Sequence, residues 1–445
     1  MSKLNSVSIS RGGKRLAARI IVLAFAGVIC RSMSANAQTV GDYRTHQTGN
    51  WSDVSSWERF DGSLWVTPAP SAPTSADGAI TVLGGHNITV DGSTNADQLT
   101  VDDGGEITVA PTITLTISDG ADSVDMMLYG TLNQFGTITA AGRISIENGG
   151  LFIYSVPAGA DIAMPSYTWR TGSTCRIDST TGSTPTNLRN QALYNLVWNG
   201  TNSGANGGPN FNDGTVISGD VRLLSSKGFQ WRLTNLSGGQ TKNIFIRGNV
   251  YVNGSAALLT STGSGADTLA KAVINIGGNV EVLSGQWSLC NSSAAYAEWK
   301  VTGDVSILGG TLQSGNSGWA FRRTLNFAGG GTQSFTVSAP GTMGSATTNF
   351  KVSNGSTVQM NFPLTLMNLG VITLERGKFV TSLANLITVP ASGTLVGGDS
   401  TSYIDGPLAL TVASTDPTTK VFPIGKGQAY RSAILIVNQD AATAT

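Results

Sequence analysis

The chain has 445 residues, of which 56 are glycine, 14 are proline and only 12% are charged, about half the charged fraction of an average soluble domain. This composition excludes charged disordered proteins, and its 40% of hydrophobic residues is enough for a long core. Beyond residue 37 the chain carries 21 Lys and Arg against 27 Asp and Glu, and this mildly acidic body lacks the concentrated basic face of a nucleic-acid-binding protein.

Residues 1–37 have the pattern of a secretory signal peptide. They contain six basic and no acidic residues, and an apolar run over 20–29 precedes a small-residue cleavage pattern at 35–37. The run is too short to span a bilayer, and the residue before Cys30 is too large for a lipoprotein signal. We expect cleavage near Gln38 and an extracellular or cell-surface protein without a transmembrane helix in the mature chain.

Residues 38–80 differ in composition and in sequence pattern from the rest of the chain. Trp51, Trp57 and Trp65 are interspersed with prolines, and no turn-and-strand pattern is present. An open end of a repetitive β-structure exposes unpaired backbone, which needs a cover. We therefore interpret residues 38–80 as an aromatic N-terminal cap for the repeats that follow.

The middle of the chain repeats one short phrase: Gly, then Asp or Asn, then Val, any residue, and an aliphatic residue. Glycine followed by Asp or Asn is typical of a tight turn, and the alternation after it is typical of a short strand with one buried face. The four clear copies begin at Gly219, Gly248, Gly278 and Gly303, which are 29, 30 and 25 residues apart.

Short strands and glycine turns at this period predict a right-handed parallel β-helix, or β-solenoid, over residues 81–325. In such a fold each coil stacks on the previous one at about 4.8 Å. Charge depletion agrees with this, because like charges at stacked positions would repel. The all-β alternatives are a string of immunoglobulin-like sandwiches and a β-propeller, whose units are longer than this repeat.

Many β-helices degrade polysaccharides, and the sequence offers few residues for that chemistry. Hydrolysis needs carboxylates on adjacent coils, one as acid and one as base. Asp102 and Asp103 are the only adjacent acidic pair, in a glycine turn, and His86 lacks the Gly-His-Gly context of such enzymes. We therefore favour a protein without catalytic residues, and keep a polysaccharide lyase or hydrolase as the alternative.

The sequence contains few candidate residues for metal binding or for cysteine chemistry. No cofactor is predicted, although Asp119, Asp122 and Asp125, spaced by three, could gather around calcium on a loop; a solvated turn between coils is the competing interpretation. Cys175 and Cys290 lack a Cys-x-x-Cys partner and fit best as small buried residues. Whether these two cysteines pair is left open.

Sugar binding without catalysis is the function for which the sequence offers candidate residues. Tryptophans are spread along the repeats, and aromatic faces in register on successive coils could stack on pyranose rings. Tyr296 and Trp299 lie in an interruption of the repeat, where binding groups tend to sit, and we select them with Trp287 as candidate glycan contacts. The alternative is that each tryptophan packs in the core.

Residues 326–445 still contain short strands, but the repeat is blurred. We expect a degenerate solenoid or a β-sandwich-like segment there. The last predicted strand, 433–437, is followed by only eight residues. We expect the natural chain to continue or to have been cut short, so that a stalk for a module beyond Thr445 is a further hypothesis.

Two segments resemble secreted, repetitive surface proteins of Bacteroidetes. The first is residues 49–91, with Gly-Asn-Trp at 49–51, then Trp57 and the strand pair of the Val-x-Ile, Gly-His-x-Val-Thr-Val type over 80–91. The second is residues 421–431, with a Phe-Pro-Ile-Gly element. The resemblance implies export by the type IX secretion machinery and display or release at the surface.

Together these observations predict an exported, non-catalytic β-solenoid that acts as an adhesin or extracellular scaffold. Its expected partners are a polysaccharide or cell-surface glycan and the export machinery, and not nucleic acid.

Overall fold

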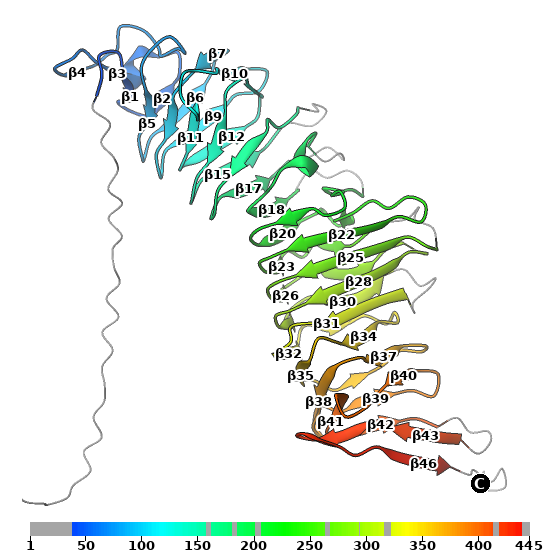
Figure 1. The fold of residues 1–445 in the computed structure, drawn as a ribbon. Coiled ribbons are helices and arrows are strands. Elements are labelled where there is room, and N and C mark those ends of the chain that lie inside the picture. Colours follow the sequence, from blue (N-terminus) through cyan, green and yellow to red (C-terminus); the bar gives the residue numbers. More distant parts are fainter. Residues whose placement is uncertain are drawn as a thin grey trace, which may run out of the picture. The chain divides into compact units, whose positions relative to one another are not determined.

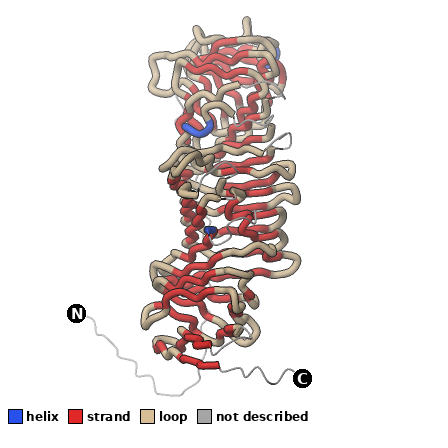
Figure 2. The backbone as a smooth tube through the Cα atoms, turned by 90° about the vertical axis from the view of Figure 1, so that its right-hand side faces the viewer, coloured by secondary structure: helices blue, strands red, loops and turns tan. Residues whose placement is uncertain are grey.

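The chain folds as an all-β solenoid, as the repeated phrase predicts. The computed structural model describes residues 38–156, 162–179, 185–200, 206–262, 268–292, 294–315, 322–412 and 418–437. The predicted signal peptide, 1–37, lies outside these residues. Figure 1 shows the strands of successive coils lying side by side along the solenoid, and Figure 2 shows them as stacked rungs.

One parallel sheet runs the length of the solenoid and forms its spine. Each coil contributes one strand, which pairs in parallel with the equivalent strands of the coils before and after, with a register shift at Trp198 and Asn199 in the pairing of β18 (Asn195–Asn199) with β20 (Val221–Ser225). The spine strands are β2 (Gly49–Asn50), β6 (Asn87–Val90), β9 (Glu106–Val109), β12 (Thr131–Gln134), β15 (Leu151–Tyr154), β17 (Thr174–Ile177), β18 (Asn195–Asn199), β20 (Val221–Ser225), β23 (Val250–Val252), β26 (Val280–Val282), β29 (Val305–Ile307), β32 (Thr332–Val337), β35 (Ser356–Met360), β38 (Gly377–Val380), β41 (Ser402–Asp405) and β44 (Ile424–Lys426).

A second face precedes the spine strand in each coil, and it is divided into two parallel sheets. The first contains β1 (Tyr43–Thr45), β5 (Ile80–Val82), β8 (Leu99–Val101), β11 (Met126–Leu128), β14 (Ile144–Ile146) and β16 (Tyr167–Trp169). The second contains β19 (Val216–Ile217), β22 (Thr241–Ile246), β25 (Lys271–Ile276), β28 (Tyr296–Val301), β31 (Arg323–Phe327), β34 (Asn349–Val352), β37 (Val371–Leu374) and β40 (Thr394–Gly397).

A third face follows the spine strand and is divided into three parallel sheets. They are β7 (Thr94–Ala96), β10 (Thr114–Ile117) and β13 (Thr137–Ala140); then β21 (Trp231–Arg232), β24 (Leu258–Thr260), β27 (Gln286–Cys290), β30 (Thr311–Gly315) and β33 (Thr342–Met343); then β36 (Leu364–Thr365), β39 (Ile387–Val389) and β42 (Leu408–Leu410). Within the described residues, the 3-10 helices η1 (Val54–Ser56) and η2 (Leu188–Asn190) lie in the connections.

Alternation along each strand builds the core. Ile88, Ile107, Leu132 and Phe152 occupy the same position on four successive spine strands, pair directly with one another, and are fully buried. Their sequence neighbours point outward. Because equivalent residues stack at every coil, the apolar interior is continuous along the solenoid, and long-range pairing rather than local propensity holds it together.

Residues 38–80 form the first coil and a hairpin on its outer side. β1 pairs in parallel with β5 and, on its other edge, antiparallel with β3 (Trp57–Phe60), which pairs with β4 (Trp65–Val66). Trp51 and Trp57 are buried in edge-to-face contact at 5.0 Å, and the Trp57 indole N–H donates to the Trp51 carbonyl at 2.9 Å. The outer edge of β1 is therefore paired with a strand of opposite direction.

Beyond residue 326 the parallel spine continues through β32, β35, β38 and β41 to β44. For this stretch the sequence predicts two alternatives, a degenerate solenoid and a β-sandwich-like segment. After the last coil, β43 (Thr418–Phe422) and β46 (Ala433–Val437) form an antiparallel hairpin, and β45 (Ala429–Tyr430) pairs antiparallel with β44. Among the described residues, no helix is both long enough and apolar enough to cross a membrane.

Candidate functional site

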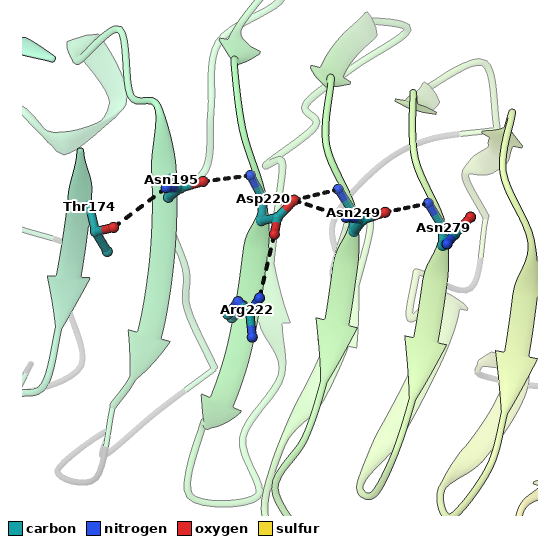
Figure 3. Close-up of polar contacts among 6 residues, drawn as sticks. All are labelled: Thr174, Asn195, Asp220, Arg222, Asn249 and Asn279. Carbon is teal, nitrogen blue, oxygen red and sulfur yellow. Dashed lines mark hydrogen bonds and ion pairs between the residues drawn. The ribbon is translucent and has the colours of Figure 1, made fainter. Parts of the chain in front are cut away.

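The Asp or Asn of the repeated phrase connects one coil to the next. The Asp220 Oδ1 accepts from the backbone N–H of Asn249 at 2.8 Å, and the Asn249 Oδ1 accepts from that of Asn279 at 2.8 Å (Figure 3). The same bond joins Asn195 to Asp220 at 2.9 Å and Asn279 to Asp304 at 2.8 Å. These side chains form a ladder that fixes the register of the spine where each strand begins.

The glycine of the phrase makes room for this ladder. A Cβ on Gly278 would lie 2.4 Å from the Asn249 Oδ1 and 2.7 Å from the Gly248 carbonyl oxygen. On Gly303 it would lie 2.2 Å from the Asn279 Oδ1. Such approaches are closer than real Cβ atoms show, so glycine and the Asp or Asn of the previous coil are required together.

The variable position of the phrase points outward and builds a row of functional groups on the spine sheet. Arg222 pairs directly with Tyr251, and Tyr251 pairs with Glu281 on the next coil. The Arg222 guanidinium lies 4.2 Å from the centre of the Tyr251 ring, and its Nη2 lies 3.5 Å from the Asp220 carboxylate (Figure 3 shows this ion pair). We call Arg222, Tyr251 and Glu281 the outward row.

The electrostatics of the outward row keep the tyrosine protonated. Burial raises the pKa of Tyr251, and the Asp220 and Glu281 carboxylates raise it further, whereas the Arg222 guanidinium lowers it. The row thus presents a guanidinium donor, a phenol and a carboxylate acceptor on three successive coils, a combination suited to sugar hydroxyls.

The candidate glycan contacts Trp287 and Trp299 are in the core. Both side chains are completely buried, their rings meet edge to face at 5.2 Å, and the Trp299 indole N–H donates to the Leu289 carbonyl at 2.8 Å. Neither ring offers a face to a sugar, so the packing alternative describes both. Trp299 lies at an inward position of the alternating strand β28, and Trp287 lies in β27, where every residue after Gln286 is buried.

Tyr296 is the one candidate glycan contact at the surface. It is 39% exposed, and the Arg322 guanidinium lies 4.5 Å from its ring centre. Arg322 is itself held by bonds to the carbonyl oxygens of Thr268 and Ala294, at 2.7 and 2.8 Å. Tyr296 therefore belongs to a second arginine–tyrosine stack, on β28, and its glycan contact stays a prediction.

The three aspartates considered for calcium line the same pocket but differ in exposure and in the contacts they make. Asp119 and Asp122 are exposed, whereas Asp125 is buried and accepts from the backbone N–H groups of Gly120 and Arg143, at 2.8 and 2.6 Å. In the described part of the chain, no group of three His, Cys, Asp or Glu side chains could hold a metal ion. Asp125 acts as a bond acceptor for the turn that joins two coils.

Asp97 faces this same turn from the previous coil. Burial raises the pKa of its carboxyl, the backbone N–H of Gln98 lowers it, and the Asp125 and Asp122 carboxylates raise it again, with a net shift upward. A Cβ on Gly120 would lie 2.2 Å from the Asp97 Oδ2, so the Asp97 carboxylate lies directly against the backbone at Gly120.

The residues considered for catalysis also hold turns. The backbone N–H of Asp102 donates to the Val82 carbonyl, its backbone carbonyl accepts from the N–H of Gly105, and burial raises the pKa of its carboxyl. The His86 Nδ1 lies 2.7 Å from the Thr45 Oγ1, which joins the second coil to the first. Each of these contacts connects neighbouring coils or closes a turn.

Cys175 and Cys290 are buried free thiols in separate parts of the fold. Cys175 pairs with Phe152 and Leu196 on the spine, and burial raises the pKa of its thiol well above the usual range. Burial also raises the pKa of Cys290. The question of pairing that the sequence left open is answered: both act as small apolar residues.

Comparison with known proteins gave no relative: no protein-family model matches the chain, and neither the curated proteins nor the solved structures include a match.

The outward row was not predicted from the sequence. Its signal was present, because the position after Val in each phrase must point away from the core, and reading that position down the copies gives Arg, Tyr, Glu and Ser.

Proposed function

We propose that this chain is an exported, non-catalytic β-solenoid that acts as a surface adhesin or extracellular scaffold and contacts glycans. The observation that carries the proposal is the outward row, in which Arg222, Tyr251 and Glu281 stand in register on a spine fixed by the side-chain ladder. A rigid scaffold presents such groups without an ordering cost when a ligand binds. We take the solenoid to be right-handed and residues 38–80 to be its cap.

Export is supported by the sequence rather than by the fold. The signal-peptide pattern of residues 1–37 and the resemblance of residues 49–91 and 421–431 to secreted Bacteroidetes surface proteins point to the outside of the cell. The type IX secretion machinery is the partner that this resemblance implies. Fractionation of cells that produce the protein tests this directly, since a protein retained in the cytoplasm would refute it.

The glycan proposal is tested by retention of the chain from residue 38 on immobilised acidic and neutral polysaccharides. We expect Tyr251→Ala and Arg222→Ala to weaken retention, because they remove the ring and the guanidinium of the outward row. Ser306→Ala is the matched control, since Ser306 pairs with Glu281 at the same outward position one coil further on. Equal retention of all three variants would refute the proposed contact.

The same samples discriminate the enzymatic alternative. A lyase or hydrolase would release new chain ends from the polysaccharide with time, whereas a binding protein leaves its length unchanged. Tyr296→Ala, tested in parallel, shows whether the second arginine–tyrosine stack contributes. Release of chain ends that is abolished by Asp102→Asn would replace the proposed function with catalysis.

A further inference from the structure

The two parts of the solenoid carry opposite charge. Residues 38–188 contain 16 acidic and 5 basic residues, and residues 189–445 contain 11 acidic and 16 basic residues. The formal net charges are therefore −11 and +5. Figure 1 shows that the coils stack in chain order, so this difference in sequence becomes a difference along the solenoid, with an acidic first part and a basic second part.

The C-terminal end of the solenoid exposes apolar side chains on a two-stranded hairpin. Val421, Ile434 and Ile436 are 51%, 67% and 65% exposed. Val421 pairs directly with Ile434, and Ile436 lies two residues further along β46, so all three share one face of the hairpin. Among the described strands, β43 and β46 pair only with each other, which leaves an open edge on each. A two-stranded hairpin of this kind is marginal by itself.

The N-terminal end exposes a second apolar group. Val40, Leu64 and Val66 are 65%, 70% and 43% exposed, and they surround the turn that joins β3 to β4. Val40 lies beside this turn, because a Cβ on Gly62 would meet its side chain at 3.0 Å. β4 is the last strand of its sheet, so its outer edge is unpaired within the described part of the chain.

Charge around the two apolar groups is complementary. Residues 38–78 contain five acidic and two basic residues, and the exposed Asp61 lies in the same turn as Leu64. The backbone N–H groups of Leu64 and Ser63 lower the pKa of the Asp61 carboxyl and keep it ionised. Residues 418–437 contain Lys420, Lys426 and Arg431 and no acidic residue.

We propose that the partner of each end is the opposite end of a second copy of this chain, so that solenoids join head to tail. The contact places Val421, Ile434 and Ile436 of one copy against the turn with Leu64 and Val66 of the next, with basic residues facing acidic ones at the rim. Such a contact is heterologous, and each new copy leaves one free head and one free tail, so it extends into a filament. It lengthens the scaffold proposed above but does not depend on glycan binding.

The test uses the chain from residue 38, one residue before the compact unit that begins at Thr39, and two variants altered only at exposed positions. The tail variant carries Ile434→Ser and Ile436→Ser, and the head variant carries Leu64→Ser and Val66→Ser. Light scattering after gel filtration measures mass against concentration, and electron microscopy shows how particles join. Unchanged circular dichroism and thermal unfolding establish that both variants fold.

We expect the unaltered chain to form linear multimers whose mass grows with concentration and falls with added salt. Each variant alone should associate at least about tenfold more weakly, because its altered end lacks the central apolar contact. An equal mixture of the two variants should form dimers and nothing larger, since one intact tail meets one intact head. An unaltered chain that stays monomeric, or a head variant that dimerises through its tail, would overturn the proposal.

Discussion

Gly278→Ala is the sharpest test of the ladder. The new methyl group would lie 2.4 Å from the Asn249 Oδ1, 2.7 Å from the Gly248 carbonyl oxygen and 2.8 Å from the Gly248 carbonyl carbon. To make room, either the Asn249 side chain must leave its bond to the Asn279 N–H, or the two coils must separate. Loss of that bond costs about 1–3 kcal/mol if the N–H is left unpaired, and overpacking against backbone costs about 1–3 kcal/mol. We expect a destabilisation of about 2–4 kcal/mol.

Gly331→Ala is the matched control. A Cβ at Gly331 meets nothing within 4 Å, and its φ is not in the left-handed region, so this substitution should be neutral or stabilise by about 0.4–1 kcal/mol. Urea titration followed by tryptophan fluorescence measures both, and amide hydrogen exchange locates the effect on β23 and β26. Local exchange matters here because stacked repeats need not unfold in one step. If Gly278→Ala is no less stable than Gly331→Ala, the steric account of the phrase is wrong.

Three other measurements test individual side chains. Trp299→Ala should cost about 3–5 kcal/mol in urea unfolding, through the cavity beside Trp287 and the lost bond to Leu289, and a smaller effect would mean that the ring is not packed as described. Cys175 and Cys290 should react with a thiol reagent only after denaturation, since both are buried, and rapid labelling of the native protein would contradict this. Because the pKa of Asp97 is raised in the folded state, its contribution to stability is full below 3.8 and is lost as pH rises above that value. Asp97→Asn should therefore raise the unfolding midpoint near neutral pH but not below pH 3.8, and the reverse pattern would refute the assigned shift.

The repeat made the fold predictable. The copies that begin at Gly219, Gly248, Gly278 and Gly303 place one residue type at one position in four coils, and the spine strands β20, β23, β26 and β29 start one residue after each Asp or Asn. Such periodicity predicts stacked coils, because equivalent positions in successive coils have equivalent neighbours.

The site was less predictable, because it depends on which side of a strand each residue occupies. The sequence offered Trp287 and Trp299 as surface rings, yet both point inward, since β27 and β28 are long strands whose register is set by their neighbours. Tyr251 was not among the predicted contacts, although its position in the phrase places its side chain on the outer face of the spine. A large aromatic side chain is equally suited to a core and to a sugar, so only its place in the alternation distinguishes the two.

The uneven spacing of the phrase has its own consequence. Neighbouring copies are separated by 29, 30 or 25 residues, yet each spine strand still meets its predecessor in register. The corners between faces therefore absorb every difference in coil length. Mutations that insert or delete residues at these corners can change what one coil displays while its neighbours keep their places, and such a molecule can diversify its surface one winding at a time.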